Sequence, residues 1–173
     1  DDAILEAIVQ EMRQLDPERT ICVMSRRPKE TRLIYRTNAI YTFNVFSVLR
    51  KFRHAALYIN GGGSLIQDVT SRRSLWFYLH NIQAAHKAGC KVQMYGCGIG
   101  PVLREQHRKL AASVLNASVD VITLREPDSQ KELQSMGVTR PEVLLTADPA
   151  LTLPAASDDE IDSVLLRAGI PPH

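Results

Sequence analysis

One stretch, residues 55–68, indicates the fold most directly: AALYINGGGSLIQD. The apolar run at 55–60 is typical of a buried strand. Three consecutive glycines follow it, and glycine allows positive φ angles and a close approach of the backbone to a neighbour. No Lys-Ser or Lys-Thr follows at Walker spacing, so the turn is not a P-loop. The stretch predicts a strand that ends in a tight turn, either empty or facing a ligand.

Apolar runs and amphipathic helical patterns alternate along the rest of the chain. The pattern predicts strands at 20–25, 39–43, 55–60, 91–95, 119–124 and 142–146. It predicts helices from the first residue to residue 15, and at 44–53, 74–88, 104–116, 128–136 and 157–169. This alternation is typical of a parallel sheet covered by helices on both faces. We therefore expect an α/β, Rossmann-like fold.

Length and composition limit the classes of protein that the chain can represent. A chain of 173 residues is long enough for one α/β domain with a core, so we expect a single domain over 1–173. The net charge of +2 is too small to imply general electrostatic binding of nucleic acid or of an anionic membrane, so any anion must be held locally. No apolar run approaches the roughly 18 residues of a membrane span, and no signal sequence opens the chain. These features predict a cytoplasmic protein with no nucleic-acid partner.

The three cysteines indicate neither a disulfide framework nor a metal site. Cys22, Cys90 and Cys97 are an odd number and lack the paired spacing of zinc ligands. His80 and His86 are six residues apart, which places them on different faces of a helix and argues against a joint metal site. We therefore predict reduced thiols and no metal.

Several of the predicted strands end in unusual turns. Gly96–Pro101 follows one strand, Arg125 to Pro127 follows the next, and Asp148-Pro149 follows the last. In open parallel sheets, ligands bind where the carboxyl ends of the strands meet. The first of these turns is not a dinucleotide fingerprint, because its third glycine comes too early and a proline follows at once. A backbone cradle for sugar or phosphate oxygens is the alternative.

Charged residues in these turns have two interpretations each. Arg125 can bind a carboxylate or phosphate through two N–H groups, or it can pair with a neighbouring acid. Glu126 before a proline fits an ordinary helix start. Asp148 can orient a hydroxyl or accept its proton, but Asp-Pro is also common turn chemistry. For His107, which shares a helical stripe with apolar residues, we expect a partly buried histidine with its hydrogen bonds satisfied.

Two arginines precede a cluster of aromatic residues. Arg72 and Arg73 are followed by Trp76, Phe77 and Tyr78. Basic and aromatic residues together occur in nucleic-acid sites, but the small net charge argues against that use. We expect instead a helix that begins beside an acceptor site.

Four segments in a fixed order resemble the polysaccharide pyruvyl transferase family. They are GGGSLIQDVTSRRSLWFYL at 61–79, KVQMYGCGIGP at 91–101, DVITLREPDS at 120–129 and TADPALTL at 146–153. The opening DDAIL is similar to the tail of that family's glycine-rich first segment. The resemblance implies that residues 1–173 are the Rossmann-like N-terminal half of a GT-B-like enzyme, with a first strand upstream and a second domain after the double proline.

The resemblance also implies an activity. Members of the family transfer the pyruvyl group of phosphoenolpyruvate to a sugar, as a cyclic ketal on two hydroxyls. The acceptor is often a lipid-linked precursor of cell wall or exopolysaccharide. We therefore expect phosphoenolpyruvate as donor substrate, a saccharide acceptor, no cofactor, no membrane span, and peripheral membrane association through the acceptor.

On this resemblance, Arg125 becomes the candidate anion clamp, and Asp68 or Asp148 the residue that orders acceptor hydroxyls. The candidate substrate-binding residues are Gly61, Gly62, Gly63, Ser64, Gln67, Gly98 and Gly100. The catalytic acid would lie in the second half, so this chain alone should fold without catalysing transfer. Two other readings stay open: a GT-B glycosyltransferase half-domain, and a non-catalytic Rossmann-like binding module.

Overall fold

A computed structural model of the chain describes residues 2–69 and 71–170. Its helices are α1 (Asp2–Leu15), α2 (Pro28–Tyr35), α3 (Val45–Phe52), α4 (Arg72–Lys87), α5 (Glu105–Ser118), α6 (Pro127–Met136), the short 3-10 helix η1 (Pro149–Thr152) and α7 (Asp158–Arg167). Its strands are β1 (Cys22–Ser25), β2 (Asn38–Tyr41), β3 (Leu57–Gly61), β4 (Ser64–Ile66), β5 (Lys91–Ile99), β6 (Val121–Leu124) and β7 (Glu142–Leu145). The expected alternation of strands and helices is confirmed.

All the strand pairs are parallel. The main sheet has the order β3-β5-β6-β7, and β4 pairs with the end of β5. Strands β1 and β2 form a separate parallel pair. Because the strands of the main sheet all run in the same direction, their carboxyl ends meet at one edge of the sheet.

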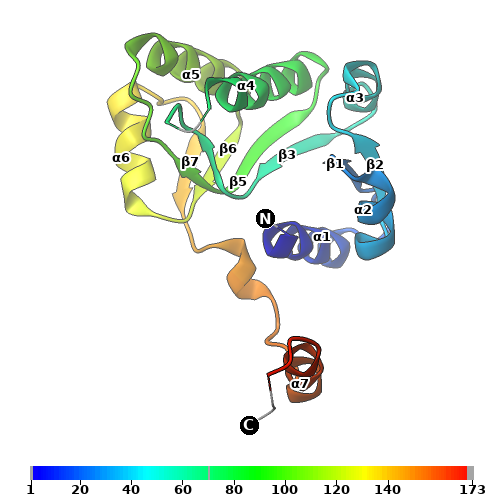
Figure 1. Cartoon of the computed structure of the whole chain (residues 1–173). Helices are drawn as coiled ribbons and strands as arrows, with labels where there is room; N and C mark the ends of the chain where they lie inside the picture. Colours follow the sequence, from blue (N-terminus) through cyan, green and yellow to red (C-terminus); the bar gives the residue numbers. More distant parts are fainter. Residues whose placement is uncertain (1, 70, 171–173) are drawn as a thin grey trace.

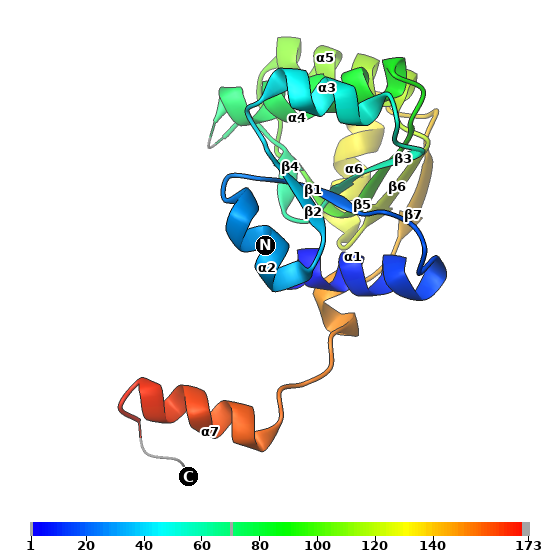
Figure 2. The same ribbon diagram turned by 90° about the vertical axis from the view of Figure 1, so that its right-hand side faces the viewer.

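Helices cover both faces of the sheet. Figures 1 and 2 show α3, α4 and α5 along one side of it and α1 on the other. Helix α4 contacts β3, β4 and β5, and α6 contacts β5, β6 and β7. Helix α7 stands apart from the sheet in both views. The prediction of an α/β fold with a covered parallel sheet is confirmed.

The core lies between the sheet and the layer of α4 and α5. Its fully buried members include Leu75 and Ile82 of α4, Met94 of β5, Leu115 of α5 and Ile122 of β6. Removing such side chains from water supplies most of the free energy of folding. The core therefore fixes the sheet, and the sheet fixes the turns at its carboxyl edge.

Two local expectations were wrong. Strand β5 does not end at residue 95 but continues to Ile99, because β4 provides it with a new partner: Gly98 N donates to the Gly63 carbonyl and Gly100 N to the Ile66 carbonyl. The predicted elements include no strand between residues 60 and 74, but the glycine turn at 61–63 leads into β4. Helix α2, strand β4 and η1 were not predicted, and all three are short.

Candidate functional site

Two glycines of the 61–63 turn, Gly61 and Gly62, lie against side chains of α1. Gly62 and Gly63 have φ angles of 76° and 69°. A Cβ on Gly61 would lie 2.5 Å from a methyl carbon of Ile8, and one on Gly62 would lie 2.8 Å from a methyl carbon of Ile4. The turn thus lets α1 contact the end of β3. Packing alone explains glycine at 61 and 62, and their role in substrate binding stays a prediction.

The segment 98–104, which comprises the end of β5 and the loop that follows it, donates its backbone N–H groups within the protein. The acceptors lie in two neighbouring segments. In the stretch 63–68 they are the Gly63 and Ile66 carbonyls for Gly98 and Gly100 and the Asp68 carboxylate for Leu103 and Arg104; in α6 they are Ser129 Oγ for Ile99 and Glu132 Oε1 for Val102. Residue 101 is a proline and has no N–H. The amides of Gly98 and Gly100 are therefore occupied, and a contact of these two residues with substrate has to use another group.

Gly98 also creates a place where two polar side chains converge. A Cβ there would lie 2.8 Å from Glu126 Oε1 and 2.9 Å from Ser64 Oγ. Glu126 precedes α6, yet its side chain makes no capping hydrogen bond; its Oε1 accepts from Ser129 Oγ at 3.1 Å. Ser64 and Glu126 are both exposed. The Ser64 hydroxyl and the Glu126 carboxylate thus both lie beside the position that a side chain at Gly98 would occupy, at the carboxyl edge of the sheet.

Sequence reasoning assigned Glu126 only to a helix start. The signal that it missed was the absent side chain at Gly98, whose meaning becomes clear only when the positions of β4, β5 and α6 are known.

Gln67, also a candidate, has a more local contact: its Oε1 accepts from Val69 N at 3.0 Å. That bond shapes the segment between β4 and α4.

Arg125 and Asp148, two of the three catalytic candidates, form an ion pair. Arg125 Nη1 donates to Asp148 Oδ2 at 2.8 Å, and the two side chains are 27% and 31% exposed. Asp148 Oδ1 also accepts from Ala150 N at the start of η1. The Ala150 N–H and then the Arg125 guanidinium hold the pKa of Asp148 below its usual range. The pair gives an oriented cation that is still within reach of a ligand.

Asp68, the third candidate, is enclosed and paired with His107. Its side chain is 1% exposed, and its Oδ2 lies 2.7 Å from His107 Nδ1. Oδ1 accepts from Leu103 N at 2.8 Å and Oδ2 also accepts from Arg104 N at 3.1 Å. Burial opposes the charge, but these hydrogen bonds outweigh it and lower the pKa of Asp68. Asp68 therefore holds the start of α5 as an ionised carboxylate, and His107 is buried with its Nδ1 hydrogen-bonded to Asp68.

The thiol nearest the site is inert. Cys97 is fully buried in β5, and burial raises its pKa to about 12. In the described part of the chain, no group of three or more histidines, cysteines or acids is placed to hold a metal ion. Four polar side chains described at this edge are exposed or partly exposed: Arg125, Asp148, Glu126 and Ser64.

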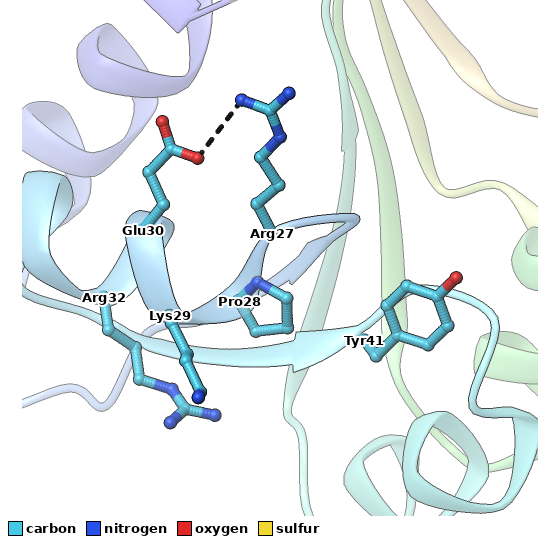
Figure 3. A pocket seen from close by; sticks show the side chains of 6 residues that line it. All are labelled: Arg27, Pro28, Lys29, Glu30, Arg32 and Tyr41. Carbon is cyan, nitrogen blue, oxygen red and sulfur yellow. Dashed lines mark hydrogen bonds and ion pairs between the residues drawn. The ribbon is translucent and has the colours of Figure 1, made fainter.

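A shallow depression of about 540 Å³ lies elsewhere, beside the β1–β2 pair. Figure 3 shows its lining residues, among them Arg27, Arg32 and Tyr41. Arg27 pairs with Glu30 at 3.4 Å, and Arg32 donates to the Ala39 carbonyl. None of the predicted site residues lines it, so the depression provides no support for the candidate site.

Comparison with known proteins gives one match. The sequence model of the family described as polysaccharide pyruvyl transferase matches residues 1–172. No curated protein and no solved structure matches the chain. The family match covers each of the polar groups described above.

Proposed function

The chain belongs to the polysaccharide pyruvyl transferase family, and from this membership we propose that it serves the transfer of a pyruvyl group from phosphoenolpyruvate to a saccharide as a cyclic ketal. The match over residues 1–172 carries the proposal. We further propose that this unit acts as one half of a GT-B-like enzyme, so that residues 1–173 alone do not catalyse the transfer.

The reaction sets defined requirements. The methylene carbon of phosphoenolpyruvate gains a proton and becomes a methyl group, and one sugar hydroxyl adds to the neighbouring carbon. The phosphate leaves with its oxygen, and a second hydroxyl closes on the same carbon. Of the two hydroxyl protons, one balances the methyl group and one the departing phosphate. The enzyme must therefore bind two anionic groups, develop positive charge at one carbon and take protons from hydroxyls.

Arg125 is suited to the anionic donor. Its guanidinium is held by Asp148 through Nη1 and remains partly exposed. A fixed guanidinium binds carboxylate or phosphate more tightly than a mobile one, because less side-chain freedom is lost. We assign Arg125 to the carboxylate or phosphate of phosphoenolpyruvate and Asp148 to its orientation.

Ser64 and Glu126 are suited to the saccharide. The hydroxyl can donate to or accept from a sugar hydroxyl, and the carboxylate can accept the proton that the hydroxyl loses. Asp68 has its oxygens occupied, so we assign it a positioning role through His107 and the start of α5. This assignment replaces direct contact between Asp68 and the acceptor.

A donor screen tests the proposal. The full-length enzyme is incubated with a saccharide that has two neighbouring hydroxyls and with either phosphoenolpyruvate or nucleotide sugars. Release of phosphate together with a new ketal methyl signal in the NMR spectrum supports pyruvyl transfer. Sugar transfer from a nucleotide donor would favour the glycosyltransferase reading, and a protein that binds ligands without turnover would favour the binding module.

A further inference from the structure

Exposed apolar side chains gather where the three helices of one layer begin. Helices α3, α4 and α5 lie on the same side of the sheet, with α4 in contact with both neighbours (Figures 1 and 2). Helices α4 and α5 follow β4 and β5, so their N-termini lie at the carboxyl edge of the main sheet. Helix α3 follows β2 of the separate pair, and the contact between Phe43 and Phe77 brings its start beside the start of α4. The apolar residues in or just before their first two turns are 54% to 78% exposed: Val45, Phe46, Val69, Trp76 and Leu103.

Three arginines accompany these side chains. Arg72 and Arg73 open α4 and Arg104 precedes α5, and all three are exposed. Among the ion pairs of the residues that the structure describes, none involves them. The neighbouring acid Glu105 is offset by Lys109 at 3.4 Å. The helix ends therefore form a local cationic and apolar surface on a chain whose net charge is only +2.

We propose that this surface, hereafter the helix-end surface, docks on a membrane that contains anionic lipids. Aromatic and aliphatic tips flanked by arginines suit the lipid interface, where rings enter the headgroup layer and guanidinium groups meet phosphates. None of the helices in the described ranges has the length and apolar character that crossing a bilayer requires. The docking is peripheral.

The helix-end surface adjoins the candidate site in the topology. Leu103 and Arg104 are the residues whose N–H groups bind Asp68, and Val69 follows Asp68 directly. Docking would thus bring the carboxyl edge of the sheet to the headgroup layer. The inference deepens the proposed function and rests on it in this respect, because an acceptor carried on a lipid is met at such a surface.

The aromatic part of the surface is held in a fixed arrangement. Phe43, which precedes α3, packs edge-on against Phe77 of α4 at 5.8 Å between ring centroids, and Arg26 lies 5.6 Å over the Phe43 ring. These contacts join the starts of α3 and α4. The exposed tips beside them are therefore presented on a rigid base, which lowers the entropic cost of binding.

Trp76 provides a direct readout, because it is the chain's one tryptophan. The purified protein is mixed with phosphatidylcholine vesicles containing phosphatidylglycerol, or with vesicles of phosphatidylcholine alone. We expect a blue shift of tryptophan emission and co-sedimentation with the anionic vesicles, both weakened by added salt. No shift and no sedimentation would overturn the proposal, as would a blue shift that depends on protein concentration without vesicles and so reports self-association.

Two sets of variants locate the contact. Phe46→Ser and the double change Arg72→Gln, Arg73→Gln should each lower vesicle partitioning about tenfold. Leu33→Ser is the matched control, since Leu33 of α2 is 81% exposed and lies outside the helix-end surface, and it should partition normally. If Leu33→Ser lowered vesicle partitioning as much as Phe46→Ser, the assignment of docking to the helix-end surface would be contradicted.

Transfer to a water-soluble saccharide is measured in parallel on the full-length enzyme. Variants that lose vesicle binding but keep this activity support both the docking surface and the proposed function. Vesicle binding without pyruvyl transfer would support the docking surface and contradict the proposed function. Pyruvyl transfer by a protein that does not bind vesicles would support the proposed function and contradict the docking surface.

Discussion

The carboxylate of Asp68 and the imidazole of His107 are joined by a 2.7 Å hydrogen bond between Oδ2 and Nδ1. Because the pKa of Asp68 is lowered, the carboxylate is ionised at neutral pH and Nδ1 carries the shared proton. The same carboxylate accepts from Leu103 N and Arg104 N. One buried charge thus ties the segment after β4 to the start of α5.

The first prediction concerns acid stability. The folded pKa of Asp68 lies below its unfolded value of about 3.9, so the native state binds fewer protons and the stabilisation exists above that pH. It is lost as pH falls through the lower, folded value. Asp68→Asn should remove this part of the pH dependence and cost about 1–3 kcal/mol of unfolding free energy at pH 7. Urea unfolding at several pH values measures both effects.

The control for this measurement is Asp128→Asn. Asp128 also has a lowered pKa, through its pairing with Lys131, but the pair lies in solvent with side chains 77% and 88% exposed. Exposed pairs contribute little to stability. If Asp128→Asn and Asp68→Asn alter acid stability equally, the enclosed charge has no special role.

The second prediction concerns the glycine turn. Gly62→Ala would place a methyl group 2.8 Å from Ile4 at a φ of 76°, so it should lower the unfolding free energy by about 2–4 kcal/mol. Gly137→Ala is the matched control, because Gly137 has a φ of 79° but no atom within 4 Å of the added Cβ. It should cost about 1–2 kcal/mol. If the urea unfolding midpoints of Gly62→Ala and Gly137→Ala did not differ, the packing of α1 would not require glycine at position 62.

The third prediction concerns the anion clamp. In the full-length enzyme, Arg125→Ala should lower kcat/KM for phosphoenolpyruvate at least about a hundredfold, because a guanidinium in a charge-assisted bond is lost. Arg125→Lys should recover little, since Lys lacks the planar fork. Lys91→Ala is the control: it breaks the 2.9 Å pair with Asp120, which joins the start of β5 to the start of β6, away from the carboxyl edge. A loss of activity in Lys91→Ala as large as in Arg125→Ala would contradict the clamp.

The fourth prediction concerns the acceptor side. Glu126→Gln should lower kcat about a hundredfold with little effect on stability, as expected for removal of a proton acceptor. Gly98→Ala should have a similar effect, because its methyl group would displace the ends of Glu126 and Ser64. Steady-state kinetics and thermal unfolding measure the two properties. Glu105→Gln, an exposed acid in the first turn of α5, serves as control and should keep full activity.

The sequence predicted the elements that have long apolar patterns, and missed what depends on contacts between distant segments. Helices α4 and α5 carry enough turns for their patterns to be read, whereas β4 has three residues and exists only because β5 pairs with it. Arg125 and Asp148 were each placed at a strand end, but their pairing across 23 residues required the register of β6 and β7. Asp68 was read as open to substrate, since nothing in its local sequence shows the backbone N–H groups of residues 103 and 104.

The segment 98–104, the end of β5 and the loop that follows it, limits how the preference for an acceptor sugar can change. Every N–H that the segment possesses is already donated within the protein, so its amides should exchange with deuterium as slowly as those of a strand interior. A substitution that reshapes this backbone gives up several hydrogen bonds at once. Directed evolution toward a new sugar should therefore accumulate changes at the side chains around it, such as Ser64, and leave the segment itself untouched.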